Sequence, residues 1–361
     1  MVILHPPILT PCKKMLSISS LLIAFFATLG AIPMCRRHQQ RSAPPSGGVD
    51  ATRSIPRGAG AGMLAGVMVS LFYMDQGFPV GTDAVGGGLL LILVGAWRER
   101  QHATRARFYG PVPFEFGASV LAGVVLLLSA PLHDFYSSLA AGVFVALILT
   151  TPASLSLLSH SSLASPALPP VIVGIQLVLL AMVGYVTPAT SSTEFNLIAP
   201  PLLGALMGVM LYLLRMPWRS EAAIALGSGA RLCLGFVVAW AAVKLMSTGT
   251  TASPLVAVIW ILSPPIFESI RVLAASSIEF ARGPSAENRG VRPADYSPVV
   301  VAILAALLGG TGILLHLQGL PATWSLAALL PCLVLYVTAP ILKASWSGYR
   351  TSSVVDATRA G

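Results

Sequence analysis

Residues 298–316 read PVVVAILAALLGGTGILLH and contain no Asp, Glu, Lys or Arg. At a rise of about 1.5 Å per residue, a helix of this length spans roughly 28 Å, close to the ~30 Å hydrocarbon thickness of a bilayer. The stretch therefore predicts a transmembrane helix. Similar apolar stretches recur along the whole chain, so their assignment as transmembrane helices determines the fold class.

The overall composition agrees with this prediction. Of the 361 residues, 55% are hydrophobic and only 10% are charged, whereas a soluble domain carries roughly a quarter charged residues. The mean hydropathy is +0.80. A water-soluble globule must cover its surface with polar groups, so this composition excludes one and favours a membrane protein.

The apolar blocks predict an all-α integral membrane protein, a polytopic bundle of about eleven transmembrane helices. We expect an N-terminal extension at 1–14, a polytopic transmembrane domain at 15–346 and a cytoplasmic tail at 347–361. The blocks cover residues 15–35, 58–74, 84–97, 114–131, 135–150, 168–186, 196–214, 222–246, 254–274, 298–316 and 323–342.

The basic residues predict an N-out, C-in orientation. Positive charge is enriched in cytoplasmic loops, and the cluster after the first block is larger than the pair before it. With eleven spans, only three of the 22 Lys and Arg residues fall outside: Lys13, Lys14 and Lys244. The long inside connections are then 36–57, 98–113, 151–167 and 275–297, so a working surface would face the cytoplasm.

The net charge of +9 does not indicate nucleic acid. The basic residues lie in short loops rather than in a soluble basic domain, so membrane lipids and anionic, phospholipid-like ligands are the better partners. The four cysteines, Cys12, Cys35, Cys233 and Cys332, form no CxxC pair. We expect neither a zinc site nor a disulfide framework.

Several inside segments resemble one family in the same order along the chain. They are residues 54–62 (SIPRGAGAG), 91–99 (LILVGAWRE), 151–164 (TPASLSLLSHSSLA), 225–236 (ALGSGARLCLGF) and 265–269 (PIFES). These segments are similar to motifs of the bacterial polyprenyl-phosphate N-acetylhexosamine-1-phosphate transferases, of the glycosyltransferase family 4 type. The resemblance implies about eleven helices in the bacterial inner membrane, an N-out topology and a cytoplasmic cleft near helices three, five, eight and nine.

The same resemblance implies a Mg²⁺-dependent transfer reaction, but this chain lacks the family's aspartates. The family transfers a sugar-1-phosphate from a UDP-sugar to a lipid phosphate with Mg²⁺, which needs carboxylate ligands. At the positions of the family's aspartates this chain has Arg98 and Glu99 as a pair, Leu158 and Ser161 in the 151–167 connection, and Ser228 in the eighth apolar block. We expect no cofactor, with Mg²⁺ only if the chain is an active enzyme.

Glu99 and Glu268 are the only acids at or near these positions, so they are the candidate catalytic residues. Glu268 could instead pair with Arg271, three residues later on the same helical face. A lipid phosphate would be bound by basic residues on the inside; the candidates are Arg57, Arg98, Arg231 and Arg289. For such residues positive-inside topology with snorkelling is the commoner explanation. The glycines Gly58, Gly60 and Gly62 are more often helix-packing residues than phosphate ligands.

The leading hypothesis is a noncatalytic relative of these transferases. It would serve as a binding or scaffold subunit that holds a lipid, polyprenyl phosphate among the candidates, and a membrane-protein partner or a second copy. One alternative is an active sugar-1-phosphate transferase of envelope polysaccharide synthesis. A second alternative is a transporter unrelated to that family.

Overall fold

The computed structural model describes residues 11–42, 59–73, 87–97, 112–129, 139–158, 167–187, 193–213, 226–247, 254–282 and 298–339. Within these ranges the regular elements are eleven helices, with no strand. Each predicted apolar block coincides with one of them. The all-α prediction is therefore confirmed for the described part of the chain.

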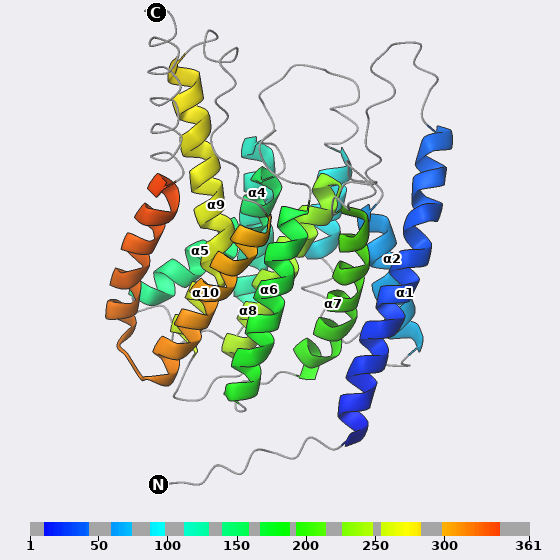
Figure 1. Cartoon of the computed structure of the whole chain (residues 1–361), viewed down its shortest axis with the longest axis horizontal. Coiled ribbons are helices and arrows are strands. Elements are labelled where there is room, and N and C mark those ends of the chain that lie inside the picture. Colours follow the sequence, from blue (N-terminus) through cyan, green and yellow to red (C-terminus); the bar gives the residue numbers. More distant parts are fainter. Residues whose placement is uncertain are drawn as a thin grey trace, which may run out of the picture.

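The labelled helices are α1 (Pro11–Ser42), α2 (Ala59–Tyr73), α4 (Val112–Ser129), α5 (Leu139–Leu157), α6 (Leu168–Val186), α7 (Thr193–Leu213), α8 (Ser228–Ser247), α9 (Leu255–Arg282) and α10 (Pro298–Leu317). Two further helices, Gly87–Trp97 between α2 and α4 and Ala322–Ala339 after α10, carry no label in Figure 1.

The helices form one bundle, in which consecutive helices such as α9 and α10 run in opposite directions (Figure 1). α1 lies at one edge and packs against α2 and α7, while the Ala322–Ala339 helix lies at the opposite edge. Between them, α5 packs against α4, α8 and α9, and α10 packs against α9 and α6. The centre of the bundle is therefore built by α5, α6, α8 and α9.

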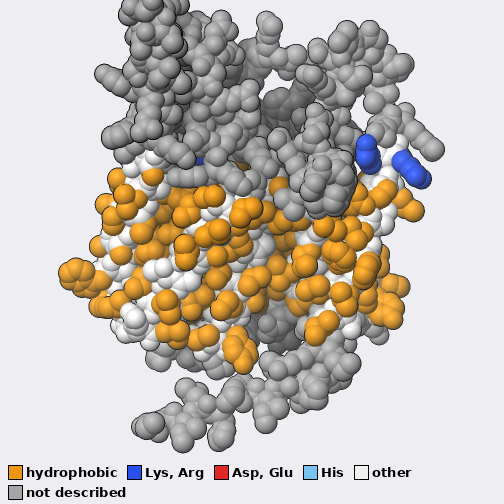
Figure 2. Space-filling model, viewed as in Figure 1, with side chains coloured by type: hydrophobic (Ala, Val, Ile, Leu, Met, Phe, Trp, Pro, Cys, Tyr) orange, Lys and Arg blue, Asp and Glu red, His pale blue; other side chains and the backbone are white. Residues whose placement is uncertain are grey.

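Burial follows this arrangement. In α8, 72% of the apolar span is buried, whereas the Ala322–Ala339 helix is only 11% buried. Large apolar side chains such as Phe72 and Leu128 are exposed. On the face shown in Figure 2, hydrophobic side chains spread across the middle of the molecule. Six helices are long and apolar enough to cross a membrane. A surface of this size and chemistry fits a membrane-embedded helical bundle.

A Schellman turn joins α10 to the Ala322–Ala339 helix. The N–H of Gly319 donates to the carbonyl of His316 at 3.0 Å, and the N–H of Leu320 donates to that of Leu315 at 3.3 Å. Gly319 has a φ of 67°, a left-handed conformation that glycine adopts without strain. Pro321 follows directly, so the chain reverses within a few residues.

One prediction is wrong in the segment that matters for the site. The sequence predicts that the chain leaves the bundle at 151–167, but α5 continues as a helix to Leu157. Leu155 and Leu158 are fully buried. Their apolar side chains are stabilised by packing in the core, so the helix continues where a polar segment would turn into a loop. Pro152 is accommodated, as prolines are in packed membrane helices.

Candidate functional site

The segments that carry the family resemblance pack against one another. The end of α5 approaches α8 where Gly235 faces Pro152: a Cβ atom placed on Gly235 would come within 2.6 Å of the Cα of Pro152. Two backbones can approach this closely only because glycine has no side chain. The segments 151–164 and 225–236 therefore meet at a helix–helix contact.

The Gly87–Trp97 helix meets the start of α8 in the same way. A Cβ on Gly95 would collide with the backbone of Gly229. Beside this contact, the buried hydroxyl of Ser228 donates a hydrogen bond to the carbonyl of Gly95 at 2.9 Å. The hydroxyl thereby links the last turn of one helix to the first turn of the next.

The glycines of α2 act in packing, as the commoner interpretation of the sequence predicts. A Cβ on Gly60 would collide with the Cβ of Ala230 in α8, and one on Gly62 would press on Ile32 of α1. The described part of the segment 54–62 thus lies against the segment 225–236, and its glycines serve close helix contact.

The fifth segment, in α9, touches the end of α5. The buried hydroxyl of Ser269 donates to the carbonyl of Ser154 at 3.1 Å, and it also lies 2.8 Å from the carbonyl of Pro265 in its own helix. Segments far apart in the sequence therefore converge on one region of the bundle, around the ends of α5 and the Gly87–Trp97 helix and the start of α8.

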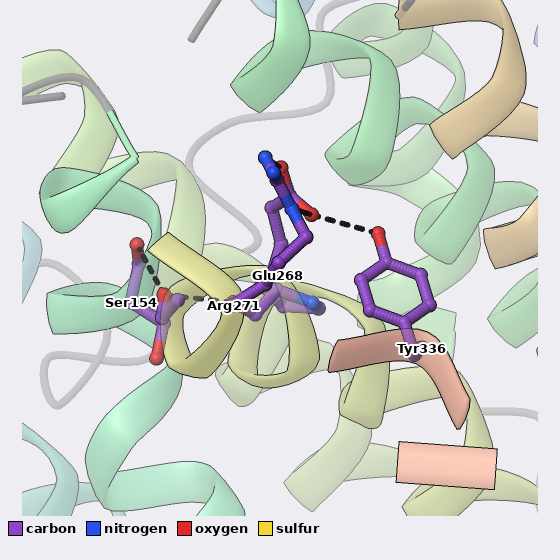
Figure 3. A network of polar contacts seen from close by, with 6 residues as sticks. Ser154, Glu268, Arg271 and Tyr336 are labelled. Carbon is purple, nitrogen blue, oxygen red and sulfur yellow. Dashed lines mark hydrogen bonds and ion pairs between the residues drawn. The ribbon is translucent and has the colours of Figure 1, made fainter. Parts of the chain in front are cut away.

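A buried ion pair occupies α9 beside this region (Figure 3). The carboxylate of Glu268 accepts two hydrogen bonds from Arg271, from Nε to Oε2 at 2.8 Å and from Nη2 to Oε1 at 2.5 Å. The side chains are 1% and 4% exposed, respectively. The hydroxyl of Tyr336, on the Ala322–Ala339 helix, donates to Glu268 Oε2 at 2.8 Å. Of the two interpretations that the sequence left open for Glu268, the structure shows the pairing with Arg271.

Tyr336 was not among the residues predicted from the sequence. Its ring lies 5.9 Å from that of Phe267, centroid to centroid, so it is held by both an aromatic contact and the carboxylate. The available signal was a lone tyrosine hydroxyl within an apolar block, and such a hydroxyl usually finds a partner when buried. Because three donors already engage its carboxylate, Glu268 acts in this structure as a tie between helices.

A second buried carboxylate, Glu115, also escaped the sequence analysis. It lies in the first turn of α4, and its Oε2 accepts a hydrogen bond from the hydroxyl of Ser156 at 2.5 Å. Ser156 belongs to the α5 extension that the sequence predicts as a loop. An acid within a predicted transmembrane block was the signal for this site.

The degenerate positions are part of the packing where the structure describes them. Leu158 is fully buried in the hydrophobic core, and Ser228 makes the bond to Gly95 described above. Arg231 is half-buried in the first turns of α8. The other site residues lie outside the described residues: Arg57, Arg98, Glu99, Ser161 and Arg289.

No group of three or more His, Cys, Asp or Glu side chains gathers within the described ranges. Glu115 and Glu268, the buried acids among these residues, are each bonded to neighbouring side chains. Compared with known proteins, the chain matches no family model and no curated protein. The family resemblance therefore rests on the sequence motifs themselves.

Proposed function

We propose that the chain is a noncatalytic membrane subunit on a scaffold resembling the polyprenyl-phosphate sugar-1-phosphate transferases. It binds a lipid and a partner membrane protein and does not turn over a nucleotide sugar. One observation supports this above the others. At two positions where the family has an acid, the chain has a buried leucine, Leu158, and a serine, Ser228, whose hydroxyl is used between helices.

The chemistry of Mg²⁺ gives this observation its weight. Mg²⁺ is held by one or two carboxylates together with phosphate oxygens and water. Leu158 offers no ligand, and Ser228 already bonds to the carbonyl of Gly95. The acid that remains at a comparable place, Glu268, is neutralised by Arg271 and bonded to Tyr336. These side chains support helix packing, which is what a binding or scaffold subunit requires.

The proposal includes eleven membrane crossings, with the N-terminus outside and the C-terminus in the cytoplasm of a bacterial inner membrane. The opposite directions of consecutive helices such as α9 and α10 support it (Figure 1), as do the exposed Arg36 and Arg37 near the end of α1. Fusions to a reporter that is active on one side of the membrane only, placed in successive connections, test the orientation. Activity on the same side in two consecutive connections would contradict it.

An exchange assay tests the catalytic half of the proposal. Purified protein in nanodiscs is incubated with Mg²⁺, undecaprenyl phosphate and a panel of UDP-sugars, beside an authentic transferase. We expect no lipid-linked sugar and no UMP release. Turnover above background contradicts the proposal, and Glu99→Gln and Glu268→Gln would then show which acid the active enzyme uses.

Native mass spectrometry tests the binding half. Protein extracted from its own membrane in mild detergent should retain a lipid phosphate beyond the bulk lipid composition, together with a membrane-protein partner. We expect Arg231→Ala to reduce the retained lipid phosphate, and Lys244→Ala, at the other end of α8, is the matched control that should retain it. Copurification of neither lipid nor partner would contradict a binding or scaffold role.

A further inference from the structure

Helix α9 lacks two of its own backbone hydrogen bonds. Pro264 and Pro265 lie inside the helix, and proline has no N–H to donate to the carbonyl four residues earlier. The carbonyls of Trp260 and Ile261 are therefore left without their helical donors. Both residues are buried, and a buried carbonyl needs a partner, above all in a membrane.

The two carbonyls receive replacement donors of different kinds. The hydroxyl of Ser263 donates to Trp260 at 2.8 Å, from within α9 itself. The side-chain amide of Gln176, in the middle of α6, donates through Nε2 to Ile261 at 2.9 Å. The bond from Ser263 lies within α9, so it can persist when α9 changes direction. The bond from Gln176 joins α9 to a neighbouring helix.

Gln176 is unusual in its surroundings. It is fully buried and is the only amide or charged side chain of α6. Its Oε1 accepts no hydrogen bond from the described part of the chain. Burial of an unpaired amide oxygen is unfavourable, so the stabilising polar contact of Gln176 in the described residues is the donation from its Nε2.

We propose that the proline pair is a joint in α9 and that Gln176 is its lock. Ile261 lies before the prolines, so the bond from Gln176 anchors the first half of α9 to α6, while the bonds of Ser269 and Glu268 hold the second half. As long as the bond to Ile261 holds, the two halves keep their relative direction. When the bond opens, the second half pivots relative to the first and carries Glu268, Arg271 and Ser269 with it. It would shift the contacts that these residues make with Ser154 in α5 and Tyr336 in the Ala322–Ala339 helix. This joint is independent of the function proposed above.

Interhelical hydrogen bonds in membranes are weak on average, so one such bond can open without unfolding the bundle. The same weakness sets the size of the expected effect. Loss of the Gln176 donor should make backbone amides after the joint exchange with deuterium about three- to tenfold faster.

Hydrogen–deuterium exchange with mass spectrometry in detergent micelles tests the joint. Gln176→Leu should accelerate exchange at residues 266–274 and leave α10 unchanged. Pro265→Ala restores an N–H for the Ile261 carbonyl, so the double variant should return to the wild-type rate. Pro264→Ala is the matched control, because it restores a donor to the other carbonyl and should not rescue Gln176→Leu.

Two results would overturn the proposal. One is wild-type exchange at 266–274 in Gln176→Leu, or acceleration spread equally over α6, α9 and α10. The other is equal rescue by both proline substitutions. If Gln176→Leu fails to fold, Gln176→Met removes the donor with less change of shape. Pro265→Ala alone should then exchange no faster than wild type, and faster exchange in it would also contradict the joint.

Discussion

Helices α9 and α10 pack against each other but bury different chemistry. α9 carries an ion pair, Glu268 and Arg271, just after its proline pair, and nearly all of it from Leu255 to Ser269 is buried. α10 contains no Asp, Glu, Lys or Arg and exposes side chains such as Ile303 and Leu307. The more polar helix is thus the more buried one.

The difference shows two ways of holding a helix in the bundle. α9 is fixed by hydrogen bonds that it accepts from Gln176 and Tyr336 and by one that it donates to the carbonyl of Ser154, each partner on another helix. α10 is fixed by shape, because Gly312 lets it approach Trp260. α9 should therefore be sensitive to the loss of single polar atoms, and α10 to the gain of volume.

The largest effect is expected where a charge loses its partner. Glu268→Leu leaves the guanidinium of Arg271 buried without its carboxylate, and breaking a buried pair in this way destabilises proteins by about 3–5 kcal/mol. We expect a loss of this size in the free energy of unfolding, measured by SDS titration in mixed micelles.

The double variant Glu268→Leu/Arg271→Met is the control for this prediction. Removing both charges leaves no unpaired ion, and such replacements are often close to neutral. We expect the double variant to be clearly more stable than Glu268→Leu alone. Equal destabilisation of the two would mean that the loss of packing, and not the orphaned charge, dominates at this position.

The next effect belongs to the tyrosine that ties the Ala322–Ala339 helix to α9. Tyr336→Phe keeps the ring contact with Phe267 but removes the hydrogen bond to Glu268. A hydrogen bond to a charged group contributes about 1.5–3 kcal/mol. SDS titration should show a loss of this size, and Tyr212→Phe, which removes a 3.1 Å bond to the neutral carbonyl of Leu29, should lose less.

For α10, the comparison predicts that added side-chain volume at a close helix contact lowers the stability of the protein. A Cβ on Gly312 would collide with the side chain of Trp260, whereas one on Gly310 meets nothing within 4 Å. Overpacking of a filled interface typically destabilises by about 1–3 kcal/mol. Gly312→Ala should show this loss in SDS titration, and Gly310→Ala should be unchanged or slightly more stable. Equal stability of the two variants would contradict the fixing of α10 by shape.

Much of this fold is predictable because membrane helices have a strong local signal. The eleven blocks follow from hydropathy alone, and the pairing of Glu268 with Arg271 follows from their spacing on one helix. Tyr336 could not be assigned to Glu268, because 68 residues separate the two. The donation from Gln176 to Ile261 likewise depends on which helices become neighbours.

The candidate site was harder to predict for a physical reason. Leu155 and Leu158 are buried where a polar loop was expected, so α5 extends and brings Ser156 to Glu115. The fifth apolar block was expected to end at residue 150, whereas the buried leucines beyond it continue the helix to Leu157. The hydrophobicity of the segment therefore determines that α5 extends, and with it which of its side chains reach a buried partner.

A smaller effect separates two hydroxyl groups that make the same kind of bond. Ser263 on α9 donates to the carbonyl of Trp260 at 2.8 Å, and Thr311 on α10 donates to that of Leu307, also at 2.8 Å. Pro264 leaves the first carbonyl without a backbone donor, whereas the second carbonyl keeps the N–H of Thr311 as its helical donor. The hydroxyl is therefore necessary in α9 and redundant in α10.

Ser263→Ala and Thr311→Val test this distinction. Ser263→Ala leaves a buried carbonyl unpaired and should lower the free energy of unfolding by about 0.5–1.5 kcal/mol. Thr311→Val keeps the volume and removes only a second, exposed bond, so SDS titration should show no resolvable change. If Pro264→Ala is added to Ser263→Ala, the restored N–H should recover most of the loss. Failure of that rescue, with Thr311→Val as damaging as Ser263→Ala, would mean that polar bonds do not distinguish α9 from α10.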